Sequence, residues 1–312
     1  MLLDRDALRP LFTEPHWIEE SFGVVERALT AAAGRFAWLH MPLSGEAGDD
    51  GDQRVNVQVE TVPDGGGYVR AYPGRSAAPP AGHPALLLDS GGRLLGLLAA
   101  DDLNAWRTAA PVAVAARHLA RPGARTVTVL GSGRQAEHLI RALRVALPAV
   151  DTIHIHSRTP EHRERLATAV HGRAVADPAD ALAAADVIAV TDGGHGDLLA
   201  AHPPSPGALV TAIMPLPLRT DRLVVPTFDG PEGRPSGWDP PHGPPGAAAG
   251  REPGEADATL AEVVAGAAAA RTDPGQVVLY DQRGQFGWDH ALLLWAFRRM
   301  TEAGRGVPFE LA

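Results

Sequence analysis

The sequence predicts an α/β protein whose central part is a Rossmann-type, doubly wound parallel sheet. Strands and helices alternate between residues 126 and 225, and a glycine-rich turn joins the first of these strands to the next helix. Such alternation implies right-handed crossovers, which make neighbouring strands parallel. Residues before 100 instead show the period of two that is typical of strands with one buried face. A mostly antiparallel unit is therefore expected ahead of the parallel sheet.

Composition excludes several kinds of catalytic site. The chain has 312 residues and a net charge of −9, all 28 basic residues are arginine, and cysteine is absent. Without lysine or cysteine there is no Schiff-base lysine, no P-loop lysine, no thiol nucleophile, no thiolate metal site and no disulfide. A GC-rich genome, which favours arginine codons, is the simple explanation for the missing lysine.

Charge and hydropathy also limit the expected partners and location. Net acidity argues against nucleic acid and anionic membranes, which attract basic surfaces. No apolar run approaches the roughly 20 residues that span a bilayer, and acidic residues near the N-terminus do not fit a signal peptide. We expect a soluble, cytoplasmic protein with no nucleic-acid partner, no membrane partner and no metal site.

The N-terminal third begins with a predicted helix and continues with short strands. Apolar residues between 18 and 33 recur at helical spacing, whereas residues 54–60 alternate polar and apolar side chains. A Ser-Gly-Gly turn at 90–92 separates two leucine-rich runs and predicts a hairpin. The expected strands are 54–60, 67–72, 85–89 and 93–98.

A long helix follows, and the alternating pattern comes after it. Asp101 or Asp102 can cap a helix that runs to Leu119. Apolar strands and amphipathic segments then follow one another as far as residue 225. The expected strands are 126–130, 152–156, 186–190, 209–213 and 223–225, and the expected helices are 135–146, 160–170 and 180–184.

The last part of the chain changes character twice. Residues 231–254 are rich in proline and glycine and have no apolar period, which predicts a flexible loop. Regular structure is expected to resume after it, with a helix at 258–270, a strand at 276–280 and an apolar helix at 288–300.

The strongest local motif lies between strand 126–130 and the next helix. A hydrophobic strand runs directly into Gly-Ser-Gly-Arg-Gln-Ala, a G-x-G-x-x-A pattern. Gly131 permits a tight turn, Gly133 lets a pyrophosphate approach the backbone, and the small Ala136 allows close helix–strand packing. The helix N-terminus adds free N–H donors. A dinucleotide is therefore expected to bind at Gly131, Ser132, Gly133, Arg134, Gln135 and Ala136.

The end of the second strand indicates which dinucleotide. An NAD site usually has an acidic residue there, about 20 residues past the glycines, to bind the ribose 2′-hydroxyl. This strand instead ends in Ser157, Arg158 and Thr159. These residues suit a 2′-phosphate, because arginine binds phosphate through two hydrogen bonds. NADP(H) is the expected cofactor, and NAD(H) is the alternative.

Several segments together resemble the ornithine cyclodeaminase/mu-crystallin family: residues 103–110, 129–136, 156–159, 185–188 and 284–289. The resemblance implies a Rossmann domain, residues 113–274, inserted into an α+β substrate-binding and dimerisation domain built from residues 1–112 and 275–312. It also implies a homodimer, a small-molecule substrate between the domains, and nicotinamide chemistry on an amino-acid carbon.

The resemblance also assigns roles to single residues. Arg107 matches the arginine that grips the substrate carboxylate, a role that suits a bidentate guanidinium. The alternative for Arg107 is an ordinary surface position on its helix. Thr108, Thr191 and Met214 would lie beside the cofactor.

Departures from the family pattern change the expected chemistry. The family's catalytic lysine belongs on the strand before Tyr-Pro-Gly, where this chain has Gly67 or Tyr68. The catalytic aspartate of the family falls at Met214 or Pro215, and an upstream carboxylate-binding arginine has only His40 near its place. Codon bias alone would leave an arginine at the lysine position, so altered chemistry is expected.

Substitute groups lie in the same segment. Alternation places Tyr68, Arg70 and Tyr72 on one face of their strand. Arg70 could bind an anion but stays charged and does not shuttle protons, whereas Tyr68, Tyr72 or His40 could transfer one. The alternative role of each is packing or a surface position.

We therefore predict an NADP(H)-dependent oxidoreductase that acts on an imine or an α-keto/α-amino acid-like substrate, such as an imine reductase or an amino-acid-type dehydrogenase. A standard ornithine cyclodeaminase is not expected. Two alternatives stay open: a catalytically silent NADP(H)-binding protein, and a cyclodeaminase or lyase with substitute acid and base residues.

Overall fold

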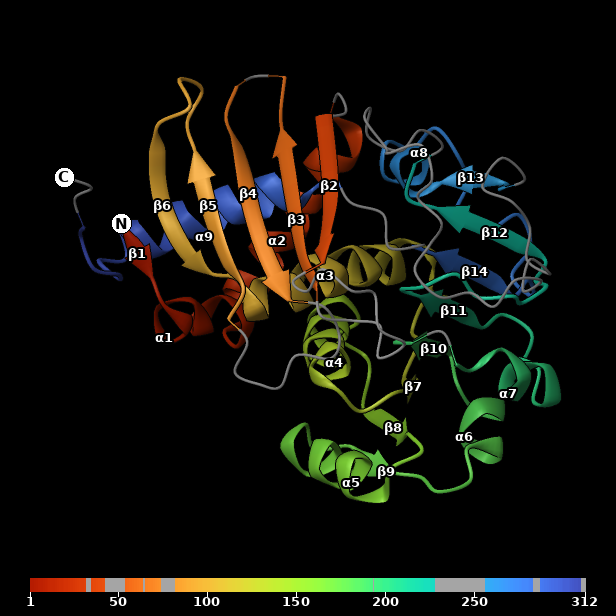
Figure 1. The fold of residues 1–312 in the computed structure, drawn as a ribbon. Coiled ribbons are helices and arrows are strands. Elements are labelled where there is room, and N and C mark those ends of the chain that lie inside the picture. Colours follow the sequence, from red (N-terminus) through yellow and green to blue (C-terminus); the bar gives the residue numbers. More distant parts are fainter. Residues whose placement is uncertain are drawn as a thin grey trace.

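The computed structural model describes residues 1–31, 35–42, 54–63, 65–73, 82–192, 194–227, 256–282 and 287–309. They form two β-sheets with helices packed between and around them (Figure 1). A six-stranded sheet comes from the N-terminal third, and an eight-stranded sheet comes from residues after 125. The predicted fold class, a doubly wound sheet joined to an α+β unit, is confirmed.

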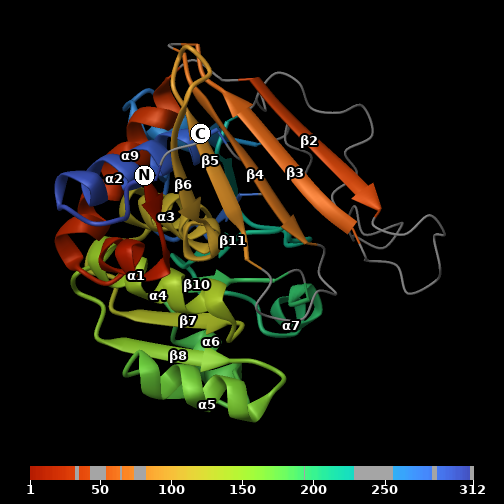
Figure 2. The ribbon, with the colours of Figure 1, turned by 60° about the vertical axis from the view of Figure 1, so that its left-hand side comes forward.

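The six-stranded sheet has the order β1-β6-β5-β4-β3-β2. Its strands from β2 to β6 are antiparallel neighbours, and β1 is parallel to β6. Figure 2 shows these strands side by side with β2 at the edge. The bounds are β1 (Leu2–Leu3), β2 (Arg35–Pro42), β3 (Arg54–Thr61), β4 (Gly67–Pro73), β5 (Pro84–Leu88) and β6 (Leu94–Ala99).

The eight-stranded sheet has the order β13-β12-β14-β11-β10-β7-β8-β9, and all of its neighbours are parallel. Six adjacent strands, β9-β8-β7-β10-β11-β14, follow the 3-2-1-4-5-6 order of the dinucleotide-binding fold, with β14 in the sixth place although β12 and β13 precede it in the chain. The bounds are β7 (Thr126–Leu130), β8 (Thr152–His156), β9 (Arg173–Ala174), β10 (Val187–Val190), β11 (Leu209–Ala212), β12 (Arg222–Val225), β13 (Ala258–Thr259) and β14 (Val278–Asp281).

Helix α3 lies at the centre of the molecule. Its middle, residues 109–116, is completely buried, because alanine, valine and proline side chains pack against helices and parallel strands alike. The Trp106 indole N–H donates to Ser21 Oγ at 3.2 Å, which joins α3 to α2. The helices are α1 (Arg5–Leu8), a 3-10 turn (Arg9–Phe12), α2 (Pro15–Thr30), α3 (Asp101–Leu119), α4 (Arg134–Ala146), α5 (Pro160–Ala169), α6 (Ala179–Ala183), α7 (Gly196–Ala201), α8 (Leu260–Val264) and α9 (Asp289–Glu302).

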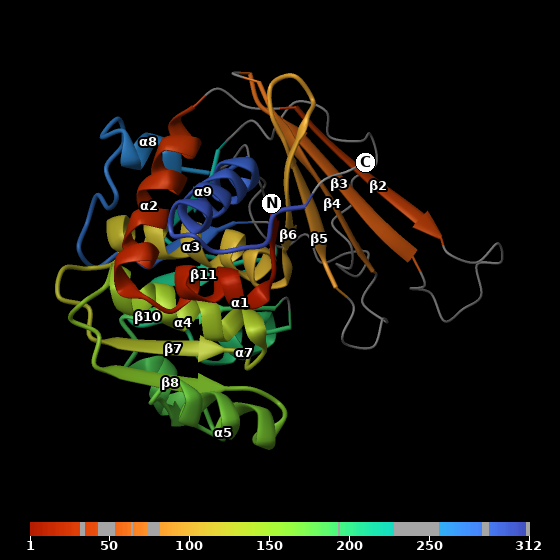
Figure 3. The same ribbon diagram turned by 90° about the vertical axis from the view of Figure 1, so that its left-hand side faces the viewer.

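On β3 and β4 the buried face of the six-stranded sheet is polar, whereas on β5 and β6 the buried residues include Ala85, Leu87 and Leu98. On β3, Asn56, Gln58 and Glu60 are buried, whereas the valines between them are half-buried. Strand register places Arg70 opposite Gln58 and Tyr68 opposite Glu60, so β4 continues the polar face. Figure 3 shows α2, α3 and α9 on one side of this sheet. No described helix covers its other side. At β3 and β4 this arrangement is the reverse of the usual one, in which the apolar side chains face the core.

Several elements differ from the sequence-based expectations. Strand β2 was not foreseen, because its run of apolar residues has no alternation. The predicted helix 258–270 is instead β13 followed by the short α8. Helix α8 begins with a capping box between Thr259 and Glu262, and Gly266, with φ of 73°, lies just past its end.

Two further expectations concern the start of α3 and the boundary between the two domains. Ala100 occupies the N-cap position of α3, so neither Asp101 nor Asp102 caps the helix. Strand β14 pairs with β11 and β12, which places it in the parallel sheet although the predicted division put residues from 275 onward in the other domain.

The predicted loop 231–254 lies outside the described residues. No helix of the described part is long and apolar enough to cross a membrane.

Candidate functional site

The turn after β7 has the geometry that a pyrophosphate needs. Gly131 has φ of 125°, and a Cβ there would overlap the Thr191 hydroxyl, so only glycine fits. Gly133 is the N-cap of α4, and a Cβ built on it meets no atom within 4 Å. This open space lies in front of the helix N-terminus, where anions bind. The turn therefore fits a dinucleotide.

The end of β8 is joined to this turn. The Ser132 hydroxyl donates to Ser157 Oγ at 2.9 Å, and Arg163 donates to the Ser157 carbonyl at 3.1 Å. Ser157 is buried, whereas Arg158 and Thr159 are exposed. The predicted 2′-phosphate residues thus lie beside the glycine-rich turn, and two of them face solvent.

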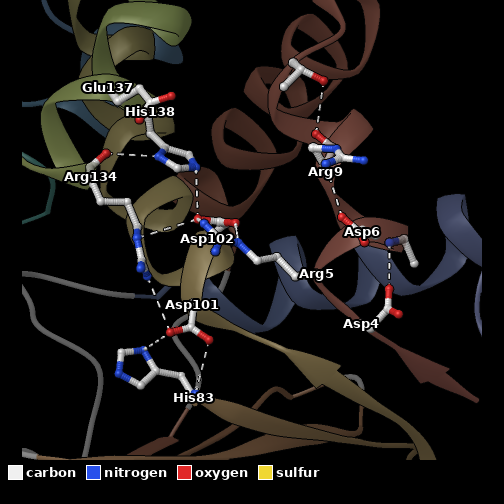
Figure 4. Close-up of polar contacts among 12 residues, drawn as sticks. Asp4, Arg5, Asp6, Arg9, His83, Asp101, Asp102, Arg134, Glu137 and His138 are labelled. Atoms are coloured by element: carbon white, nitrogen blue, oxygen red, sulfur yellow. Dashed lines mark hydrogen bonds and ion pairs between the residues drawn. The ribbon is translucent and has the colours of Figure 1, made fainter. Parts of the chain in front are cut away.

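Two side chains of the turn bind helix α3. Arg134 lies 3.4 Å from Asp101 and 3.8 Å from Asp102, as Figure 4 shows. Gln135 donates to the Ala105 carbonyl at 3.0 Å. The start of α4 is therefore attached to the start of α3, the helix that carries Arg107.

Of the other residues expected near the cofactor, Thr191 and Met214 follow strands of the parallel sheet, and Thr108 lies in α3. Thr191 follows β10, and its hydroxyl donates to the Leu130 carbonyl at 3.0 Å. Thr108 donates to the Asn104 carbonyl within α3 at 3.3 Å. Met214 follows β11 and is partly buried against the core. These positions are consistent with the expected cofactor, although the hydroxyls of Thr191 and Thr108 both donate to backbone carbonyls.

A cluster of buried charges lies where the six-stranded sheet meets α3 and α9. The Arg70 side chain is 3% exposed, donates to Asn104 Oδ1 at 2.9 Å and to Gln58 Oε1, and lies 3.8 Å from Asp289 Oδ2. Arg107 Nε lies 3.9 Å from the same Asp289 oxygen and 3.5 Å from Asn104 Oδ1. The two guanidinium groups therefore converge on one carboxylate and one amide.

Tyr68 and Glu60 complete this cluster. The Tyr68 hydroxyl donates to Asp289 Oδ2 at 3.1 Å, and Glu60 Oε2 accepts the His290 backbone N–H at 3.2 Å. Burial, and then the charge of Asp289, raise the pKa of Glu60 to about 8 and hold the pKa of Tyr68 well above its ordinary value. Burial and the charge of Asp289 thus favour the protonated, neutral form of Glu60, so the two arginines are opposed mainly by Asp289, which favours binding of an anion.

The backbone of Arg107 is held from the opposite end of the chain. Pro111, four residues further along α3, has no N–H, so the Arg107 carbonyl lacks its usual helical donor. The Trp288 indole N–H donates to this carbonyl instead, at 2.6 Å. The start of α9 is therefore fixed against the turn of α3 that carries Arg107.

Of the remaining predicted catalytic residues, Tyr72 lies at the open end of the cluster. Its hydroxyl accepts from Gln58 Nε2 at 3.2 Å, the Arg70 guanidinium lies 5.3 Å from its ring centroid, and the His83 ring lies edge-on at 5.5 Å. The backbone of His40 pairs with Asn56, but its side chain is outside the described residues. Structure therefore brings together Tyr68, Arg70, Tyr72 and Arg107.

Sequence reasoning missed several residues of the site. No motif in the sequence marks Gln58, Glu60 or Asn104, and Asp289 is the first residue of α9, directly after the N-cap residue Trp288. The signal that could have indicated them is the row of Asn, Gln and Glu at alternate positions of β3. Polar side chains on one face of a strand can point into a buried site as well as into solvent. Within the described residues no group of three or more His, Asp or Glu side chains could hold a metal ion.

Comparison with known proteins gives a consistent set of similarities. The model of the ornithine cyclodeaminase/mu-crystallin family matches residues 64–214, which include Arg70, Arg107 and the glycine-rich turn. An uncharacterized cyclodeaminase of Sinorhizobium fredii is 29% identical over 286 residues, covering 83% of this chain and 85% of that protein.

Two further similarities concern named enzymes. An L-lysine cyclodeaminase of Streptomyces rapamycinicus is 37% identical over 122 residues, which span 37% of this chain and only 35% of that protein. The structure of a Thermococcus litoralis Delta(1)-pyrroline-2-carboxylate reductase in complex with NADH and L-proline has a TM-score of 0.76 at 19% identity, covering 99% of this chain and 100% of that one. At this identity the structural match shows a common fold.

The two glycines of the turn should respond differently to alanine. Gly131→Ala forces a side chain into a left-handed conformation and into Thr191, so we expect thermal unfolding to show a loss of about 1–2 kcal/mol or more. Gly133→Ala should unfold like the wild type but bind NADPH about tenfold more weakly, because its methyl group blocks the anion's approach. Equal NADPH affinity of Gly133→Ala and wild type, in a fluorescence titration, would contradict this account.

Replacing Glu60 should change how stability depends on pH. Because its folded pKa is raised from 4.5 to about 8, the native state retains a proton that the unfolded chain loses, so wild-type stability falls as pH rises from 4.5 through 8. Glu60→Gln, which keeps an acceptor for the His290 N–H, should lose less stability over that range. Chemical denaturation of both proteins at pH 5 and pH 8 measures the difference, and equal pH slopes would show that Glu60 is ionised in the native state.

Proposed function

Because residues 64–214 match the model of the ornithine cyclodeaminase/mu-crystallin family, we propose that this chain is an NADP(H)-dependent oxidoreductase. It would reduce, or form, the carbon–nitrogen double bond of an imine bearing a carboxylate. The observation that carries this proposal is the convergence of Arg107 and Arg70 beside α3, the helix to which the glycine-rich turn is attached. The two arginines and the glycine-rich turn are thus all attached to α3. Arg107 is part of this helix, Arg70 donates to its Asn104, and Arg134 lies beside its Asp101.

Each residue of the cluster has a defined part in this proposal. Arg107, which is 18% exposed, binds the substrate carboxylate, and the buried Arg70 strengthens the local positive potential. Asp289 and Asn104 keep the two guanidinium groups in place. When bound, NADP(H) supplies or accepts hydride at its nicotinamide ring, and the buried walls of the cluster exclude water from the reacting carbon.

Cofactor preference for NADP(H) over NAD(H) rests on the end of β8. No acidic side chain follows this strand before α5, and the exposed Arg158 and Thr159 stand beside Ser132 of the turn through Ser157. A guanidinium and hydroxyl groups suit a 2′-phosphate. The Thermococcus structure, which has a similar fold, contains NADH. The fold alone therefore does not decide between NADP(H) and NAD(H).

A direct assay tests the proposed activity. Purified protein should oxidise NADPH, and NADH less efficiently, with 1-pyrroline-2-carboxylate or another cyclic imino acid, or with an α-keto acid plus an amine. Arg107→Gln should raise the KM for the imine about tenfold to a hundredfold, because a charge-assisted contact is lost. Arg117→Gln, on the same helix but paired with Glu19 at the surface, is the matched control and should behave like the wild type.

Two outcomes of this assay would overturn the proposal. NADPH binding without turnover across the panel would indicate a silent binding protein. Release of ammonia from a diamino acid with no net change in NADPH would indicate a cyclodeaminase, the activity named for the Streptomyces relative.

We also propose that the protein is a homodimer in which a second copy covers the outer face of the six-stranded sheet. That face is apolar and half-buried in the single chain, and the edge residue Leu2 is 37% exposed. Large contiguous apolar faces mark association surfaces. The residues that form it are Val55, Val57, Val59, Val69, Ala71, Leu86, Leu97 and Ala99.

Solution mass tests the dimer. Light scattering after size exclusion should give twice the chain mass of 32.7 kDa, and Val57→Glu should shift the protein towards the monomer because it buries an unpaired charge in the interface. Ala200→Glu, on an exposed position of α7, should leave the mass unchanged. A wild-type monomer at micromolar concentration would show that the apolar face has no such partner.

A further inference from the structure

A second group of titratable side chains links the arginine pair to the glycine-rich turn. Asp101 and Asp102 begin α3, Arg134 begins α4, and His83 precedes β5 (Figure 4). Neither the family resemblance nor the sequence patterns drew attention to His83. Its position between substrate-binding and cofactor-binding elements makes it the candidate for the missing acid/base group.

His83 is held by Asp101 on two sides. Its backbone N–H donates to Asp101 Oδ2 at 3.3 Å, and its ring Nδ1 lies 3.8 Å from Asp101 Oδ1. The ring packs edge-on against Tyr72. Nδ1 has no hydrogen-bond partner among the described residues, although it is shielded from solvent. A small movement of either side chain would convert the 3.8 Å contact into a hydrogen bond, as is common when a catalytic pair closes on its substrate.

Other groups in the cluster are less suited to proton transfer. Tyr68 is completely buried and donates to Asp289, and the guanidinium of Arg70 does not give up its proton. His138 lies near Asp102, at 3.7 Å, but its ring is enclosed by Phe12 and Trp106, and its Nδ1 donates to the Arg134 carbonyl at 3.0 Å. The His83 side chain, by contrast, is 20% exposed, so a substrate can reach it.

Charged groups from three elements face His83. Burial lowers its pKa below the ordinary value, Asp101 of α3 opposes this effect, and Arg70 of β4 and Arg134 of α4 add to it. Tyr72 of β4 is the remaining titratable group in contact. A histidine in this environment is mainly neutral at pH 7 and takes up a proton at lower pH, with Asp101 stabilising the imidazolium.

We propose that His83 is the proton donor and acceptor of this enzyme, with Asp101 as its positioning residue. The inference rests on the proposed function. In the reductive direction, the imine carbon receives the hydride that NADPH supplies, while the imine nitrogen takes the proton of the His83 imidazolium. The products are the amine and NADP⁺, and neutral His83 regains its proton from solvent. In the oxidative direction, neutral His83 takes the proton of the amine nitrogen, and the hydride of the carbon would pass to NADP⁺.

The decisive experiment compares His83→Gln and Asp101→Asn with the wild type between pH 5 and pH 9. With 1-pyrroline-2-carboxylate as probe, His83→Gln should lower kcat about a hundredfold or more while the KM and the NADPH dissociation constant change little. Wild-type kcat for reduction should rise as pH falls below the ordinary histidine pKa, and His83→Gln should lose that dependence. His162→Gln, on the exposed face of α5, is the control.

A spectroscopic measurement gives a readout that does not depend on turnover. The His83 imidazole resonance, assigned by its loss in His83→Gln, should titrate below pH 6.5 in the wild type and at still lower pH in Asp101→Asn, since the carboxylate raises its pKa. Free imidazole should also restore part of the activity of His83→Ala, because the side chain is reachable from solvent.

The outcomes separate this inference from the proposed function. If the wild type reduces the imine and His83→Gln keeps its kcat and pH profile, His83 is not the proton donor and the proposed function stands. If the wild type never oxidises NADPH with any imine or keto acid, both are wrong. Unchanged titration of His83 in Asp101→Asn would overturn the role of Asp101.

Discussion

The contact between Arg70 and Asp289 is the interaction on which the rest of the candidate site depends. Both groups are almost completely buried, and removing one charge of such a pair commonly costs about 3–5 kcal/mol because the other is left unpaired. The pair joins a strand of the N-terminal sheet to the first turn of the last helix. Tyr68, Asn104 and Arg107 then find their partners on these same two groups. The two ends of the chain are therefore brought together by charge, and the anion-binding residues are a consequence of that arrangement.

The reversed polarity of β3 and β4 follows from the same constraint. Strands that contribute Gln58, Glu60 and Arg70 to a buried cluster must turn the valines between them outward. The alternation of β3 thus places polar side chains on its buried face and valines on its outer face. The usual rule, in which the apolar face of a strand lies in the core, does not hold for these two strands.

Fold class could be predicted from the sequence because its signals are local. The strand–turn–helix around Gly131, the alternation after residue 125 and the hairpin at 90–92 each lie within a short stretch of chain. The site could be predicted only in part, since its contacts join residues far apart in the sequence. Nothing near Glu60 indicates that it meets Tyr68 and the first turn of α9, and nothing near His83 indicates Asp101. Expecting a helix at 258–270 overlooked Gly266, whose positive φ suits a helix end.

Pro111 limits which substitutions this protein can accept during evolution. By lacking an N–H, it leaves the Arg107 carbonyl open to the Trp288 indole. An ordinary residue at 111 would bring back a competing donor, and a side chain without a donor at 288 would leave a buried carbonyl unsatisfied. Neither substitution is neutral alone, so positions 111 and 288 are expected to covary among related chains. The position of the Arg107 backbone thus depends on a pair of residues, one in the middle of the chain and one near its end.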